Sequence, residues 1–141
     1  MLKTILVALD GSDLSQRVMQ CLEELQLQPA TKIVLSHVIS SSGTDVEVAV
    51  DRPHGFSEEL PYREIEKKLE SYQEYLPYES ELEIVTGDPA EEIVRLAHIY
   101  KADLILIGSR GLTGVERIIE GSVSSEVVAD APCSVLVVKP E

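Results

Sequence analysis

The sequence predicts an α/β protein: a single domain with an open parallel five-stranded sheet, doubly wound by helices on both faces. Residues Leu104–Ile107 form an apolar run without a polar interruption, which is typical of a strand buried on both faces of a parallel sheet. A strand, a helix and a second strand fit within the first third of the chain, which is the pattern of a βαβ unit. With 141 residues, the chain is long enough for one domain with a sizeable core.

The chain begins with this βαβ unit. Residues Leu2–Leu9 are predicted to form a buried strand, and residues 10–13 a turn that caps the next helix. That helix is predicted from apolar residues at helical spacing, namely Leu14, Val18, Cys21, Leu22 and Leu25. The second strand is expected at Lys32–Val38.

A long loop is expected next, from Ile39 to about Pro61, because turn formers are frequent there and apolar periodicity is weak. We expect its residues 41–60 to be mobile, since they carry little apolar surface that could dock. The helix that follows has a solvated charged face, ends near Pro77, and is predicted from Ile65, Leu69, Tyr72 and Leu76.

The second half continues the alternation of strands and helices. A third strand is expected around Leu82–Val85 and ends at Gly87. Residues 88–91 predict a helix start, because an aspartate cap precedes proline and a glutamate completes a capping box. The buried face of this helix is predicted to hold Ile93, Leu96, Ala97 and Tyr100. After the fourth strand, residues 121–122 open a last helix, and Cys133–Val138 form the fifth strand.

The stretch between the fourth strand and the last helix is rich in glycine. It contains Gly108, Arg110, Gly111, Thr113, Gly114 and the pair Gly121-Ser122. Glycine lets backbone N–H groups approach a ligand closely, and a helix N-terminus attracts anions, so the pattern favours phosphate binding. Its spacing is neither the Walker pattern nor the dinucleotide fingerprint, and turns in an ordinary α/β crossover are the alternative interpretation.

The spacing of Gly108, Gly111 and Gly121-Ser122 resembles the nucleotide-binding signature of the universal stress protein family, in its ATP-binding branch. The resemblance implies one such domain over residues 1–141, with a variable loop at about 40–60. It extends to the segments ILVALDGSDLS, LSHV, TGDPAEEIVRLA, ADLILIGSRG and APCSVLVVKP. It also implies a Rossmann-like fold of the adenine nucleotide alpha hydrolase type with strand order 3-2-1-4-5. Ligands of such sheets bind at the strands' carboxyl ends where the winding reverses, which here is between the first and fourth strands.

The resemblance implies that ATP, or another adenine nucleotide, binds at this point, with Mg²⁺ held through the phosphates. Asp10 would reach the ribose or phosphate region and is a candidate Mg²⁺ ligand, with a helix cap as its alternative role. Ala8, Val38 and Ile107 would line the adenine pocket, with plain core positions as the alternative. The other implied site residues are Gly108, Arg110, Gly111, Gly121, Ser122 and Val123. Arg110 would pair with phosphate or point to solvent.

The last strand, residues 133–138, predicts a homodimer. It is apolar on both faces. In the implied strand order it lies at a sheet edge, where its backbone groups would otherwise be unpaired. A second copy is the simplest cover, and the resemblance implies association through this strand.

Composition excludes several classes of partner and site. The formal net charge is −13, and most of it falls in residues 45–92, without a basic stripe for nucleic acid or an anionic membrane. Cys21 and Cys133 lack metal or redox spacing and are expected to be buried reduced thiols. His37 is expected to be a satisfied core histidine without a ligand role. The first apolar run is too short for a membrane span or signal segment, so a cytoplasmic location is expected.

These observations favour a nucleotide-dependent stress-response or signalling factor. No nucleophile and base with clear spacing are present, so no dedicated catalysis is expected, and slow ATP hydrolysis would be incidental or a switch. The alternative is a small adenylating or ATP-pyrophosphatase-type enzyme of a related fold, with residues 10–12 as its phosphate loop. A phospho-receiver domain is disfavoured because no adjacent acidic pair follows the first strand, and a flavin carrier because aromatic residues are scarce.

Overall fold

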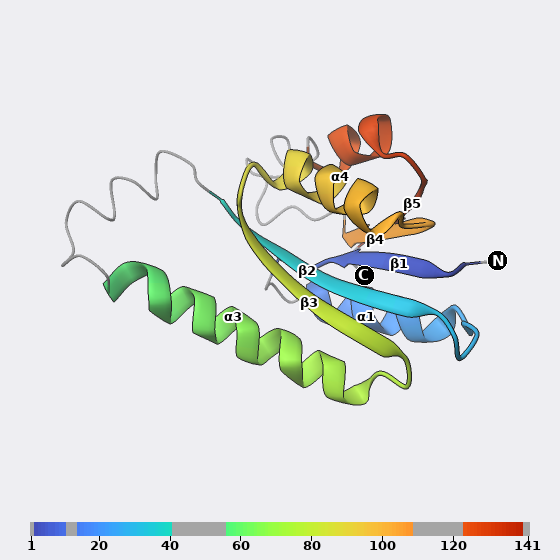
Figure 1. The fold of residues 1–141 in the computed structure, drawn as a ribbon, viewed down its shortest axis with the longest axis horizontal. Helices are drawn as coiled ribbons and strands as arrows, with labels where there is room; N and C mark the ends of the chain where they lie inside the picture. The colour runs from blue at the N-terminus through green and yellow to red at the C-terminus, as the bar shows by residue number, and fades with distance from the viewer. Residues whose placement is uncertain (1, 11–13, 41–55, 109–122, 140–141) are drawn as a thin grey trace.

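The computed structural model describes residues 2–10, 14–40, 56–108 and 123–139, with the backbone alone for residues 14, 40 and 56–61. Strands and helices alternate along the chain, as the sequence predicts (Figure 1). Residues 123–130 form a further helix. The bounds of the other elements are β1 Thr4–Ala8, α1 Leu14–Glu24, β2 Lys32–Ser40, α3 Phe56–Tyr75, β3 Glu79–Gly87, α4 Pro89–Tyr100, β4 Leu104–Gly108 and β5 Ser134–Val138.

All five strands are parallel and lie in the order β3-β2-β1-β4-β5, which confirms the order that the resemblance implied. The central strand β1 pairs with β2 on one side, where Ala8 faces Ser36, and with β4 on the other, where Ala8 faces Ile107. Helices α1 and α3 cover one face of the sheet, and α4 with the helix at 123–130 covers the other (Figure 1). The winding therefore reverses between β1 and β4.

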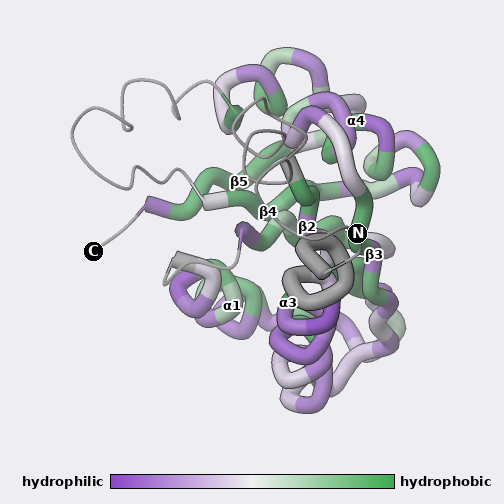
Figure 2. Tube along the Cα trace, turned by 90° about the vertical axis from the view of Figure 1, so that its left-hand side faces the viewer, coloured by the Kyte–Doolittle hydropathy of each residue, from purple (hydrophilic) through white to green (hydrophobic). Residues whose placement is uncertain are grey.

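The core has two layers because successive strand residues point to opposite faces of the sheet. Ile5 and Val7 pack with α1 and α3, whereas Leu6 packs with α4 and with Val127 of the last helix. Figure 2 shows hydrophobic residues along the strands and hydrophilic ones on the outer surface of α3. Each fully buried aliphatic side chain of this kind stabilises the fold by about 1.5–3 kcal/mol. Burial on both faces explains why the strand sequences are continuous apolar runs.

Helix α4 begins as the sequence predicts. Asp88 is the N-cap, its carboxylate accepts a hydrogen bond from the Glu91 N–H at 3.1 Å, and Pro89 is the first helical residue. The helix ends at Tyr100 and is capped by Lys101, which adopts the left-handed conformation with φ 53°. Ile93, Leu96 and Ala97 are buried as expected, whereas Tyr100 is only half-buried. The reason is that its hydroxyl reaches Glu83 at the edge of the sheet.

The predicted loop at 39–61 is wrong at both ends. Strand β2 continues to Ser40, because its ladder with β3 extends as far as the pair Ser40 and Gly87. Helix α3 begins at Phe56 and includes Pro61, since strong helix formers dominate the segment around this proline. Of the segment predicted to be mobile, residues 41–55 lie outside the described residues and residues 56–60 belong to α3, so its mobility stays a prediction.

Other boundaries and burial states also differ from the predictions. Strand β1 is shorter than Leu2–Leu9, and β3 starts three residues before Leu82, because Glu79 already pairs with Lys32 of β2. Cys21 and Cys133 are free thiols, as expected, but half-buried rather than buried. In the described part of the chain, no helix is both long and apolar enough to cross a membrane.

Candidate functional site

The carboxyl ends of β1 and β4 meet at the point where the winding reverses. Ala8, the last residue of β1, faces Ile107, and the next residue of β4, Gly108, faces Val138 of β5. After Gly108 the chain passes through residues 109–122 and returns at Val123, in the first turn of the last helix. The topology therefore brings Ala8, Ile107 and Gly108 together, as the sequence predicts.

Four of the predicted site residues, three of them predicted to line the adenine pocket, share one cluster on the α4 face of the sheet. Ala8, Val38 and Val123 are half-buried and pack against a buried group that includes Ile107. We call these four residues the aliphatic cluster. Ile107 is only 5% exposed and so offers little surface to a ligand, whereas the other three retain accessible surface. An apolar surface with a few polar groups beside it is typical of small-molecule sites.

Asp10 supplies a carboxylate at the same edge of the sheet. It lies two residues after the end of β1 and is exposed to solvent. The buried Ser15 of α1 donates a hydrogen bond from its Oγ to Asp10 Oδ1 at 3.3 Å. The aspartate is thus tied to the start of α1 and still accessible to a ligand, so the structure is compatible with both of its predicted roles.

The donor set at this edge fits Mg²⁺ only in company with a phosphate. Among the described residues, no three His, Cys, Asp or Glu side chains gather as metal ligands. Mg²⁺, however, commonly binds one or two carboxylates and completes its shell with water and substrate phosphates. Asp10 provides one such carboxylate, which would hold the ion beside a bound nucleotide.

His37 contacts the chain immediately before Asp10. Its Nδ1 lies 2.8 Å from the carbonyl oxygen of Leu9, so this nitrogen carries the proton and donates to the carbonyl. Burial lowers the pKa of His37, although the Leu9 carbonyl and the charge of Asp10 act in the opposite direction. The imidazole is therefore neutral near pH 7. The expected satisfied histidine is confirmed, but it is half-buried rather than a core residue.

The imidazole of His37 faces away from the aliphatic cluster. It lines a small hollow on the α1 and α3 side of the sheet, together with Leu9, Ser15, Ile65, Lys68, Leu69 and Tyr72. The contacts of Ser15 and His37 were not foreseen from sequence. The only indication of these contacts in the sequence was that Ser15 and His37 each lie within a few residues of a predicted site residue.

The remaining predicted residues follow Gly108. Arg110, Gly111, Gly121 and Ser122 lie outside the described residues, so their contribution to the site stays a prediction.

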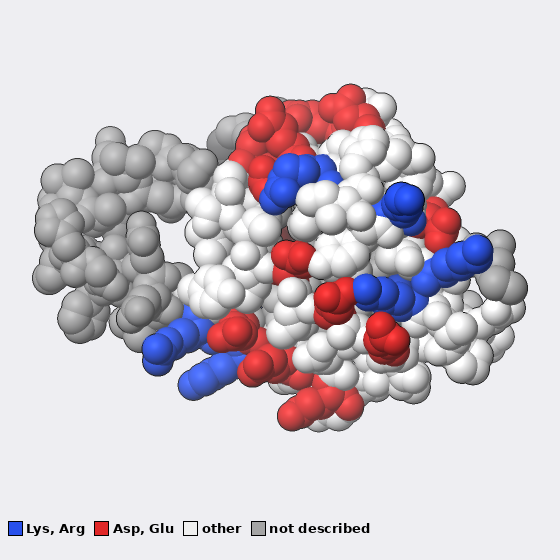
Figure 3. Space-filling model, viewed as in Figure 1, with Lys and Arg blue, Asp and Glu red and all other residues white. Residues whose placement is uncertain are grey.

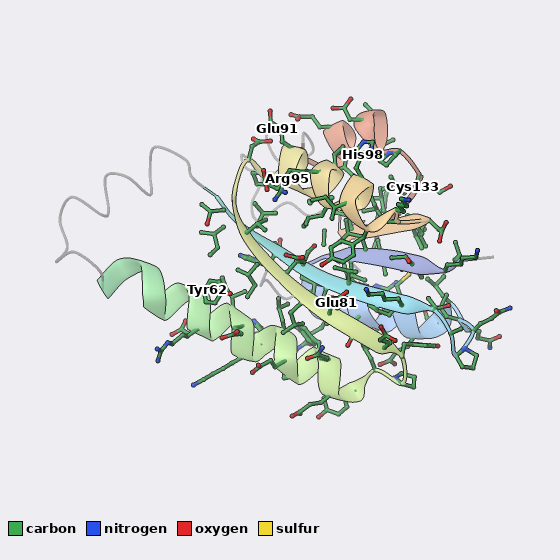
Figure 4. All side chains as sticks on the ribbon, in the orientation of Figure 1. Tyr62, Glu81, Glu91, Arg95, His98 and Cys133 are labelled. Carbon is green, nitrogen blue, oxygen red and sulfur yellow. The ribbon has the colours of Figure 1, made fainter. Side chains whose placement is uncertain are left out.

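A second cluster of polar side chains lies around the outer strand β3, away from the switch point. Lys32 forms an ion pair with Glu81, and its Nζ lies 5.4 Å from the ring centroid of Tyr100, whose hydroxyl donates to Glu83. Burial and the bond to Glu83 raise the pKa of Tyr100. Figure 3 shows acidic and basic side chains interspersed on this side of the molecule, and Figure 4 marks Glu81 on β3. These pairs join β2, β3 and α4.

Comparisons with a family profile and with individual known proteins point to the same family. The sequence profile of the Universal stress protein family matches residues 1–139. The universal stress protein MJ0531 of Methanocaldococcus jannaschii is 35% identical over 144 residues, which cover 97% of this chain and 82% of that protein.

Solved structures share the fold over the full length. The hypothetical protein MJ0577 is 29% identical, with a TM-score of 0.80, and the match covers 100% of this chain and 98% of that one. A universal stress protein from Archaeoglobus fulgidus, solved in complex with dAMP, is 24% identical, with a TM-score of 0.68 and coverage of 99% and 100%.

Proposed function

This chain belongs to the universal stress protein family, and from that premise we propose that it is a nucleotide-dependent stress-response or signalling factor that binds ATP. The observation that supports the proposal best is the aliphatic cluster at the switch point between β1 and β4, with the exposed Asp10 two residues after Ala8. Open α/β sheets bind ligands at this position. We propose a cytoplasmic location for it, which cell fractionation tests.

Two kinds of surface would bind the two parts of the nucleotide. The faces of an adenine ring are apolar, and the accessible parts of Ala8, Val38 and Val123 offer an aliphatic surface of matching character. Asp10 follows Ala8 by two residues and is exposed, so we propose that it faces the ribose and phosphates and holds Mg²⁺ against the phosphates. The bound ion would neutralise part of the phosphate charge.

The phosphates would lie against the segment that follows Gly108. We propose that the backbone N–H groups around Gly111 and Gly121 bind them, with Ser122 and Arg110 adding a hydroxyl and a guanidinium donor. The relative that was solved with dAMP supports an adenine nucleotide as the ligand class. At 24% identity that relative supports the fold, and the choice of ATP rests on the resemblance of this chain's glycine spacing to the signature of the ATP-binding branch.

Replacement of Gly121 by Val tests the phosphate site. A side chain there would occupy the space of a phosphate, and we expect ATP affinity to fall by more than about tenfold, or about 1.4 kcal/mol. Ser122→Ala should cost less, since it removes one donor. Gly43→Val, a glycine outside the signature, is the matched control. Titration calorimetry with ATP gives the affinities, and mass spectrometry of nucleotide released from freshly purified protein identifies the natural ligand. Equal ATP affinities of wild type and folded Gly121→Val would refute the phosphate site.

We further propose binding rather than dedicated catalysis, with slow ATP hydrolysis either incidental or a switch. Chromatography of the nucleotide after long incubation with the protein measures this directly. Rapid multiple turnover with a second substrate would instead establish the adenylating or pyrophosphatase type of enzyme.

The proposal includes a homodimer through β5. Within the described residues this strand pairs with β4 alone, and its Val135, Leu136 and Val137 are half-buried in the single chain. The other edge of the sheet, β3, carries Glu79 and Glu81, and charged side chains of this kind discourage pairing with another strand. A two-fold axis along β5 would pair the strand antiparallel with itself. Sedimentation at micromolar concentration should show a dimer, and a clean monomer would refute the proposal.

A further inference from the structure

The end of β1 is held by an unusual sequence of hydrogen bonds. Strand β1 ends at Ala8, whereas β2 and β3 remain paired as far as Ser40 and Gly87. One more backbone bond follows, from the Leu9 N–H to the Ser36 carbonyl oxygen at 2.9 Å. The next acceptor, the carbonyl oxygen of Leu9, lies 2.8 Å from Nδ1 of His37. A side chain therefore binds the carbonyl that leaves the ladder.

The direction of the Leu9 carbonyl determines the direction in which the backbone enters Asp10. The carbonyl carbon of Leu9 and the nitrogen of Asp10 belong to one planar peptide group, so fixing the direction of the C=O fixes the direction in which Asp10 begins. Leu9 is 3% exposed and His37 is half-buried, so water competes weakly for the bond. The carboxylate of Asp10 is held separately by Ser15, from α1.

We propose that His37 is a positioning residue for Asp10: its imidazole binds the Leu9 carbonyl and thereby aims Asp10 at the ribose and phosphate region of the bound nucleotide. This inference rests on the proposed function, since it assigns Asp10 to that site. His37 itself does not touch the nucleotide, because its ring lies on the α1 and α3 side of the sheet. The aliphatic cluster lies on the α4 side.

Two substitutions separate the hydrogen bond from packing. His37→Leu keeps a side chain of similar bulk in the hollow beside Leu9 and Leu69 but removes the donor. His37→Asn retains a donor, because the asparagine Nδ2 takes nearly the position of the imidazole Nδ1. The exposed His98 on α4, labelled in Figure 4, provides the control His98→Leu.

Coupling to Asp10 is the readout that a purely structural role would not change. We expect His37→Leu to weaken ATP binding by about tenfold in the wild-type background and by less than about twofold in Asp10→Asn, since the residue acts through Asp10. His37→Asn and His98→Leu should bind within about twofold of wild type. If His37→Leu weakens binding by the same factor in both backgrounds, or if His37→Asn fails to restore it, the inference is overturned.

A ligand-free measurement distinguishes this inference from the proposed function. In the absence of nucleotide, the backbone amide resonance of Asp10 should move in His37→Leu and stay near its wild-type position in His37→Asn and His98→Leu. An unmoved Asp10 resonance in His37→Leu overturns the positioning role even if the wild type binds ATP. A moved resonance, together with a wild type that binds no nucleotide, keeps the mechanical link and rejects the proposed function.

Discussion

Removal of the Asp103 carboxylate should measurably loosen the start of the sheet. One oxygen of this side chain, Oδ2, accepts hydrogen bonds from the backbone N–H groups of Lys3 at 2.8 Å and Thr4 at 2.9 Å. The Asp103 N–H also donates to the Thr4 carbonyl at 2.8 Å. The partners are about a hundred residues apart in sequence, so Asp103 ties the entry of β4 to that of β1.

The size of the effect follows from these bonds. Each bond contributes a net of about 0.5–1.5 kcal/mol, and partial exposure favours the low end, so Asp103→Ala should cost about 1–2 kcal/mol. Asp103→Asn keeps an acceptor oxygen and loses only the charge, so we expect about half of the stability loss of Asp103→Ala. With an unfolding entropy of about 2.1 cal/mol/K per residue, 1.5 kcal/mol corresponds to about 5 °C in Tm for 141 residues.

The pH dependence gives a second test of the same bonds. They lower the pKa of Asp103, so the contribution of its charge to stability is fully present above the unfolded value near 3.9 and is lost as pH falls through the folded pKa. Urea unfolding of wild type and Asp103→Ala should therefore differ by a constant amount between pH 5 and 8, and this difference should shrink to about half at lower pH, because the protonated carboxyl still accepts hydrogen bonds. The control is Asp130→Ala, at an exposed position of the last helix. Equal losses in Asp103→Ala and Asp130→Ala, or a difference between wild type and Asp103→Ala that is undiminished at pH 2, would refute this reasoning.

Three further outcomes are expected. Val127→Ala should lower the free energy of unfolding by about 2 kcal/mol in urea, because Val127 is fully buried. Val128→Ala, at a neighbouring position that is 54% exposed, should lower it by about 0.5 kcal/mol or less. Similar losses in the two variants would contradict the packing of the last helix. Burial lowers the pKa of His37, so wild type should lose stability relative to His37→Leu as pH falls below the unfolded value of about 6.5, and parallel stability curves would contradict this. Val137→Pro removes a backbone donor from β5 and should weaken the dimer in sedimentation, while Thr86→Pro on β3 should not; a dimer insensitive to Val137→Pro places the interface elsewhere.

The sequence by itself determined what depends on short-range pattern. The uninterrupted apolar run at Leu104–Ile107 identified a buried strand because a parallel strand covered on both faces needs no polar side. The start of α4 was predictable because Asp88 and Glu91 are three residues apart, the spacing of a cap and its N–H. The order of the strands came from resemblance, since no local pattern records which strand pairs with which.

Only the tertiary structure decided which distant residues meet. The first half of β3 was not predicted from the sequence, because glutamates occupy alternate positions there. Pairing with β2 nevertheless extends that strand from Glu79 to Gly87. His37 looked like an ordinary residue of an apolar run, and its role depends on β1 leaving the ladder beside it at Leu9. The hydrogen bond from the Thr4 N–H to the Asp103 carboxylate depends on the adjacency of β1 and β4 in the same way. The physical reason is that strand register, rather than local propensity, sets these contacts, and register exists only after the sheet has assembled.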